Sequence, residues 1–146
     1  VRVKSHAARL ASGDPRAGLS SRCDVDEFLF RYRVLTYSVV DGDTVDMELD
    51  VGFRWSMRDR FRLYGPDPAG KVGLDAPEMN TPEGRAARDW LVARLAGAKL
   101  VARTILDARE KYGRLLVVLF AQRATDLWAN VNAELLAAGH AKAKTY

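Results

Sequence analysis

Four acidic residues stand in two short turns of the chain and have the types and spacing of metal ligands. Asp41 and Asp43 flank Gly42 just before an alternating segment, and Asp75 and Glu78 bracket an Ala-Pro pair. Carboxylate oxygens are the ligands that Mg²⁺ and Ca²⁺ prefer, so acids brought together from strand ends would bind a hard cation. Taken alone, each turn is more commonly an ordinary Asp-Gly turn or a polar loop.

Two arginines supply the positive charge that chemistry on a phosphodiester would need. Cleavage requires an activated water, positive charge around the phosphorus oxygens and a route for the leaving oxygen. Arg62 shares the polar face of an expected strand with Arg60, and Arg114 ends a basic loop that contains Lys111 and Tyr112. Either arginine alone is more commonly a solvated surface charge. Combined with the two acidic turns, they predict phosphate binding around a metal.

Short alternating segments predict the scaffold for these residues. Thr44 to Val51 alternates apolar and polar residues throughout, which is typical of a strand with one solvated face. Thr81 and Pro82 form a helix start. We expect strands over residues 28–37, 44–51, 57–64, 99–106 and 115–121, and helices over residues 83–96 and 130–138. This order predicts an α+β, mainly β fold: a five-stranded barrel of the oligonucleotide/oligosaccharide-binding (OB) kind with two helices.

The composition is that of one globular domain with a basic surface. The 146-residue chain has a formal net charge of +4, which favours an anionic partner, although a basic surface can also serve solubility. Residues 1–26 lack a sustained period and are expected to form an extension, with the domain over residues 27–146. Cys23 is the only cysteine, which excludes an intramolecular disulfide and a cysteine-based zinc site. We expect a monomer. We also expect that it binds no membrane, because the chain shows neither a signal-peptide pattern nor a long apolar run. Secreted and cytoplasmic locations both stay open.

Five motifs in order closely resemble the staphylococcal nuclease, or thermonuclease, family. They are Asp-Gly-Asp-Thr, Arg-Leu-Tyr-Gly, Asp-Ala-Pro-Glu, Lys-Tyr-Gly-Arg and Val-Asn-x-x-Leu-x-x-x-Gly, and the resemblance covers about residues 32–142. The resemblance implies a five-stranded barrel with helices and a Ca²⁺-dependent nuclease. Its substrates would be DNA and RNA, preferably single-stranded, and its products would carry 5′-hydroxyl and 3′-phosphate ends.

The resemblance also assigns roles to the acidic residues. Asp43 and Asp75 would be direct metal ligands, with the carbonyl oxygen of Ala76 beside them and Asp41 in the outer shell. Glu78 would orient or deprotonate the attacking water.

The basic and aromatic residues of the motifs would contact the substrate. By the same resemblance, Arg62 and Arg114 would clamp the scissile phosphate, and Lys111 and Tyr112 would bind neighbouring backbone groups. Tyr146 approximates a substrate-stacking tyrosine of the family, although its register is off by one.

The chain departs from the family between the strand arginine and the metal-binding aspartate. About eight residues, roughly 66–73, are additional there, and Asp67 stands where the family spacing would place the ligand. We favour Asp75 as the ligand because Ala76 to Glu78 complete its motif, with Asp67 as the alternative. A longer loop costs little in closure entropy, whereas a shift of about 1 Å at a ligand could cost about 100-fold in activity.

Three functional hypotheses follow from this departure. The first is a Ca²⁺-dependent nuclease. The second is an OB-fold module that binds nucleic acid but cleaves weakly or not at all because of the insert. The third is a switch-like variant in which the inserted segment sets activity, and it rests on the echo between residues 65–69 and residues 73–77.

Overall fold

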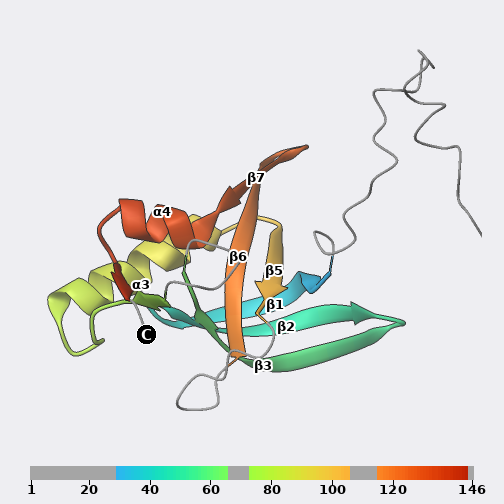
Figure 1. Ribbon diagram of the computed structural model, residues 1–146, viewed down its shortest axis with the longest axis horizontal. Helices are drawn as coiled ribbons and strands as arrows, with labels where there is room; N and C mark the ends of the chain where they lie inside the picture. Colours follow the sequence, from blue (N-terminus) through green and yellow to red (C-terminus); the bar gives the residue numbers. More distant parts are fainter. Residues whose placement is uncertain (1–28, 66–72, 106–114, 145–146) are drawn as a thin grey trace, which may run out of the picture.

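Five strands form a closed barrel in the computed structural model, which describes residues 29–65, 73–105 and 115–144 (Figure 1). The barrel strands are β1 (Arg31–Asp41), β2 (Thr44–Gly52), β3 (Trp55–Leu63), β5 (Leu100–Thr104) and β6 (Leu115–Ala124). Neighbours pair in the order β3-β2-β1-β5-β6, and a parallel β3–β6 pairing closes the ring. The predicted α+β, mainly β OB-type barrel is confirmed.

Apolar residues at alternate positions fill the barrel. In β2, Val45, Met47 and Leu49 are fully buried, and they share the core with Phe61 and Leu63 of the neighbouring strand β3. This is the alternation that predicted strand 44–51, because successive side chains of a strand point to opposite faces. The predicted barrel strands agree with the observed ones to within a few residues, with β3 beginning at Trp55 rather than Met57.

Two helices pack on the barrel, as predicted. Helix α3 (Pro82–Leu95) starts at Thr81, whose side chain accepts a hydrogen bond from the Gly84 N–H at 3.0 Å. Helix α4 (Val131–Ala137) starts at Asn130, whose side chain accepts from the Ala133 N–H. Neither helix, nor any other in the described part of the chain, is long and apolar enough to cross a membrane.

A single carboxylate joins the two helices to the barrel wall. Glu134 of α4 accepts a hydrogen bond from Arg94 of α3 at 2.5 Å and pairs with Arg123 of β6. Partial burial raises the pKa of Glu134, but the hydrogen bonds and charges of the two guanidinium groups outweigh burial and bring the pKa below its usual range. Ionised Glu134 therefore stabilises the packing of both helices on the barrel.

Three short strands were not predicted. They are β4 (Gly73–Asp75), β7 (Leu127–Asn130) and β8 (Lys142–Lys144). Strand β7 extends the sheet beyond β6, while β4 and β8 form a separate antiparallel pair. Elements of three or four residues are too short for a two-residue period to be recognised.

The β2–β3 hairpin continues past the barrel as a projecting arm (Figure 1). Phe61, Arg62 and Leu63 of β3 are buried, but the six preceding residues, 55–60, are all exposed. The same strands therefore line the barrel at one end and carry exposed side chains away from it at the other.

Candidate functional site

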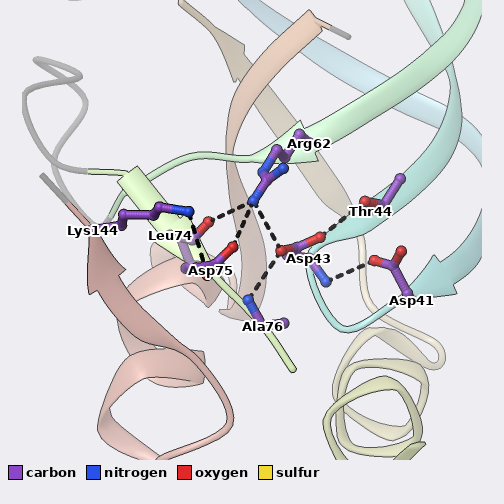
Figure 2. Close-up of polar contacts among 8 residues, drawn as sticks. All are labelled: Asp41, Asp43, Thr44, Arg62, Leu74, Asp75, Ala76 and Lys144. Atoms are coloured by element: carbon purple, nitrogen blue, oxygen red, sulfur yellow. Dashed lines mark hydrogen bonds and ion pairs between the residues drawn. The ribbon is translucent and has the colours of Figure 1, made fainter. Parts of the chain in front are cut away.

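The Asp41-Gly42-Asp43 turn places one buried carboxylate at the start of β2 (Figure 2). Asp41 Oδ1 accepts a hydrogen bond from the Asp43 N–H at 3.1 Å, which fixes the turn. The Asp43 carboxylate accepts from the Thr44 hydroxyl at 2.9 Å through Oδ1 and from the Ala76 N–H at 3.0 Å through Oδ2. The second contact joins the two acidic turns that the sequence keeps far apart.

Arg62 lies between the two turns, at the end of β3. Its Nη2 is 3.0 Å from Asp75 Oδ1, 3.5 Å from Asp43 Oδ2 and 3.4 Å from the Leu74 carbonyl oxygen (Figure 2). Arg62 and Arg60 share a face of β3, as predicted, but only the Arg62 side chain is covered, being 11% exposed. Arg60 instead pairs with Asp46 on the surface. Arg62 is therefore a buried charge at the site and not the solvated one that a lone strand arginine usually is.

Strand β4 carries Asp75 to this point and is itself held by β8. Leu74 is fully buried, and its neighbour Asp75 is in register with Lys142 of β8. The second oxygen of Asp75 faces Lys144, whose Nζ is 3.7 Å away. The carboxylate of Asp75 thus stands between the two cations, Arg62 inside and Lys144 outside. The structure places Asp75 against Asp43, and Asp67 lies outside the described residues.

Two glycines allow the acidic turns and helix α3 to meet. A Cβ on Gly84 would lie 2.0 Å from the Glu78 carbonyl oxygen, and a Cβ on Gly42 would lie 2.7 Å from Ala87 Cβ and 2.9 Å from Ala76 Cβ. Real Cβ atoms do not approach so closely, so only glycine fits at either position. We did not predict these positioning roles. The signal in the sequence was a glycine in the first turn of a helix, where most residues would serve better.

The comparison with known families agrees with this geometry. Residues 71–146, just over half of the chain, match the family model described as "Staphylococcal nuclease homologue". The chain belongs to the staphylococcal nuclease homologue family. A search of the curated proteins found no match. Membership makes the chain a nuclease-like or nucleic-acid-binding module.

The matched stretch contains some of the predicted site residues, and others lie before it. Asp75, Ala76 and Glu78 lie within it, whereas Asp43 and Arg62 lie upstream. The hydrogen bond from Ala76 to Asp43 and the ion pair of Arg62 with Asp75 join the two groups. Asp43, Arg62, Asp75 and Ala76 therefore come together in space, although their catalytic and metal-binding roles stay predictions.

Asn132 of the Val-Asn motif is hydrogen-bonded to the backbone just after β3. Its fully buried side chain donates to the Gly65 carbonyl oxygen at 2.9 Å and to that of Val117 at 3.2 Å, and accepts from the Leu119 N–H at 3.0 Å. A buried amide with its partners satisfied ties α4, β6 and the end of β3 together. The asparagine was recognised as part of a motif, but its structural role was not predicted.

Burial dominates the electrostatics of Asp43. It raises the pKa of the Asp43 carboxyl above the usual value, and the Ala76 N–H and the Arg62 charge offset this only in part, while Asp41 adds to the rise. A carboxylate held partly desolvated gains from any further positive charge brought to it.

The donor set fits a hard cation that retains other oxygen ligands. In the described residues no group of three or more His, Cys, Asp or Glu side chains is close enough to enclose a metal ion. Asp43 and Asp75 nevertheless contact the same Arg62 nitrogen, so two carboxylates converge at one point. Such a pair suits Ca²⁺ or Mg²⁺ with the rest of the coordination shell supplied by backbone, water or phosphate oxygens.

Of the remaining predicted residues, Glu78 is exposed to solvent and the others lie outside the described part of the chain. Glu78 is exposed, and its carbonyl oxygen accepts from the Thr81 N–H and hydroxyl. Arg114, Lys111, Tyr112 and Tyr146 lie outside the described residues. Strand β6 begins at the residue after Arg114 and enters the barrel beside the site, because Leu116 is the register partner of Arg62.

Proposed function

We propose that this domain is a Ca²⁺-dependent endonuclease that hydrolyses phosphodiester bonds of DNA and RNA and leaves 3′-phosphate ends. The observation that carries the proposal is the convergence of Asp43 from the β1–β2 turn, Arg62 from β3 and Asp75 from β4 at one point. Phosphodiester cleavage needs a cation site and a group that binds the phosphate. The two carboxylates can provide the first, and the buried guanidinium between them can provide the second.

The acidic residues would bind the metal ion and activate the water. Asp43 and Asp75 would hold the Ca²⁺ ion with their carboxylates, Ala76 with its carbonyl oxygen and Asp41 from the outer shell. When bound, the cation would neutralise charge on the phosphate oxygens. Glu78, which follows the Asp75-Ala76-Pro77 segment and is exposed, would accept the proton of the attacking water.

Arg62 would bind the non-bridging oxygens of the scissile phosphate, together with Arg114. As the water oxygen bonds to phosphorus, the bond to the 5′-oxygen breaks, and that oxygen leaves as a hydroxyl after taking up a proton. Because the guanidinium is already oriented by Asp43 and Asp75, little reorganisation is required when charge develops on the phosphate.

One experiment separates cleavage from binding alone. The protein is incubated with single-stranded DNA in millimolar Ca²⁺ and with a chelator, and products are analysed for 3′-phosphate ends. We expect cleavage in Ca²⁺ and none with chelator. Binding without chelator-sensitive cleavage would overturn the nuclease proposal.

That second outcome corresponds to a binding module, which one observation favours. Both carboxylates already have cationic partners, since Arg62 contacts each of them and Lys144 faces Asp75. A domain of this kind would bind nucleic acid through its basic side chains without holding a catalytic cation.

A further inference from the structure

The tip of the β2–β3 arm exposes two large aromatic side chains to solvent. Phe53 is 97% and Trp55 is 73% exposed, and Val51 and Met57 beside them are exposed as well. With Gly52, three of these residues line a shallow apolar concavity of about 380 Å³, which is at the small end of the range for ligand sites. Clustered apolar groups in water mark a site of interaction more often than isolated ones do.

The backbone of the tip is strained in a way that keeps these side chains in place. Gly52 and Trp55 are register partners, so Phe53 and Arg54 are the two central residues of the turn. Both have positive φ, 54° and 64°, a region that such turns usually fill with Asn-Gly. A bulky residue in this region costs about 1 kcal/mol or more. Strain and exposure together make the aromatic tip a candidate binding site.

The arm connects this tip to the candidate site. Its strands run from the Thr44 and Arg62 pair at the site to the Gly52 and Trp55 pair at the tip, a distance of roughly 23 Å at about 3.3 Å per residue. One OB fold contacts about 4 to 16 nucleotides of a single strand. The tip is therefore within reach of a strand whose scissile phosphate lies at Arg62.

A row of arginines shares one face of β3, opposite to the face of Trp55 and Met57. Arg58 and Arg60 precede Arg62 at two-residue intervals and are 74% and 54% exposed. Each is oriented by an acid of β2, Arg58 by Glu48 and Arg60 by Asp46. A guanidinium has five N–H donors, so donors are left for a phosphate. Because the acids reduce the net charge of the row, the aromatic tip is expected to supply most of the binding.

We propose that Phe53, Arg54 and Trp55 form a stacking site for unpaired bases of a single-stranded nucleic acid whose backbone follows Arg58 and Arg60 to the candidate site. Aromatic rings and guanidinium planes both stack on bases, and every base offers a π-face. The inference deepens the proposed function, since it names single-stranded substrates longer than about four nucleotides. Arg54 between two aromatic residues favours this anionic partner over a purely apolar one.

The test measures binding without cleavage. Affinity for fluorescent DNA strands of about 4 and about 16 nucleotides is measured by anisotropy in the presence of chelator. The test variant combines Phe53→Asn with Arg54→Gly, which suits the positive φ of the turn, and Trp55→Ala is made separately. We expect each variant to bind the long strand about 10-fold more weakly and the short strand equally well. The turn variant should also unfold at a higher temperature, which excludes misfolding as the cause.

Trp128→Ala is the matched control, because Trp128 is an exposed tryptophan on β7, outside the arm. Unchanged affinity of both arm variants for the long strand, or an equal loss in the control, would overturn the stacking site. Loss of binding to anionic lipid vesicles without any change in DNA affinity would assign the tip to a membrane surface and also overturn it. Failure of the wild-type protein to bind any strand would instead remove the proposed function itself, and DNA binding without cleavage in millimolar Ca²⁺ would remove only the nuclease activity.

Discussion

Arg62 and Asp75 form an ion pair of 3.0 Å although 13 positions separate them in the sequence. The intervening segment differs in length from that of the family, and yet the guanidinium of one and the carboxylate of the other meet. The placement of the acidic turn is therefore compatible with the extra residues. Each prediction below perturbs one contact of this arrangement or of its support.

Replacing Arg62 with Gln should lower the rate of cleavage of a short DNA strand by about 100-fold, because a preorganised donor to the phosphate is lost. Lys at this position should restore little, since an ammonium cannot contact both carboxylates and a phosphate as a guanidinium can. The matched control is Arg60→Gln on the same face of β3, which should change the rate less than about 3-fold, as expected of an exposed pair. Wild-type rates in Arg62→Gln would contradict the clamp.

Lys144→Met should increase the affinity for Ca²⁺. Lys144 lies 3.7 Å from Asp75 Oδ2, so its ammonium competes with a cation for the same carboxylate. The pair is about half exposed, and its loss should tighten binding only about 2- to 5-fold. Calorimetric titration measures this, with Lys142→Met as the control of equal charge on the same strand. Equal effects of the two substitutions would show a general charge effect and no competition.

Gly84→Ala should destabilise the domain by about 1 to 3 kcal/mol, since its Cβ would lie 2.0 Å from the Glu78 carbonyl oxygen and would force apart the acidic turn and helix α3. In an unconstrained helix the same change would be stabilising. Chemical denaturation gives the free energy of unfolding. The exposed neighbour Ala86, changed to Gly, should lose no more than about 1 kcal/mol. A stabilised Gly84→Ala variant would show that the contact can relax.

Glu134→Gln should lower stability near neutral pH and have little effect in acid. The folded-state pKa of Glu134 lies below its usual value, so its ionised form contributes stability above the ordinary pKa of a glutamate and loses it as pH falls through the folded value. We expect a loss of about 1 to 2 kcal/mol at neutral pH. Denaturation midpoints of both proteins across the acid range should converge. A constant difference would assign the effect to packing.

The sequence predicted what depends on local pattern. The alternation of β2, with Val45, Met47 and Leu49 inside, and the cap at Thr81 both follow from neighbours in the chain. The order of the predicted strands and helices was then consistent with a five-stranded barrel. The convergence of Asp43 and Asp75 was accessible only because the motifs resembled a family.

Features that depend on distant segments were beyond sequence reasoning. Arg62 is buried because β4 lies over it, and β4 is held by the three-residue strand β8. The role of Gly84 depends on the carbonyl of Glu78, and that of Asn132 on the backbone of Gly65 and Val117. No local period reports such contacts.

The acidic turn is positioned by contacts on its downstream side and across the barrel. Ala76 is bound to Asp43, Asp75 to Arg62 and Lys144, and the Glu78 carbonyl rests against Gly84. None of these partners lies between residues 66 and 72, so we expect the contacts to persist when the length of that segment changes. That segment is therefore a natural position for grafting a peptide or a reporter domain next to the site, where binding of an analyte to the graft could be read out through DNA cleavage.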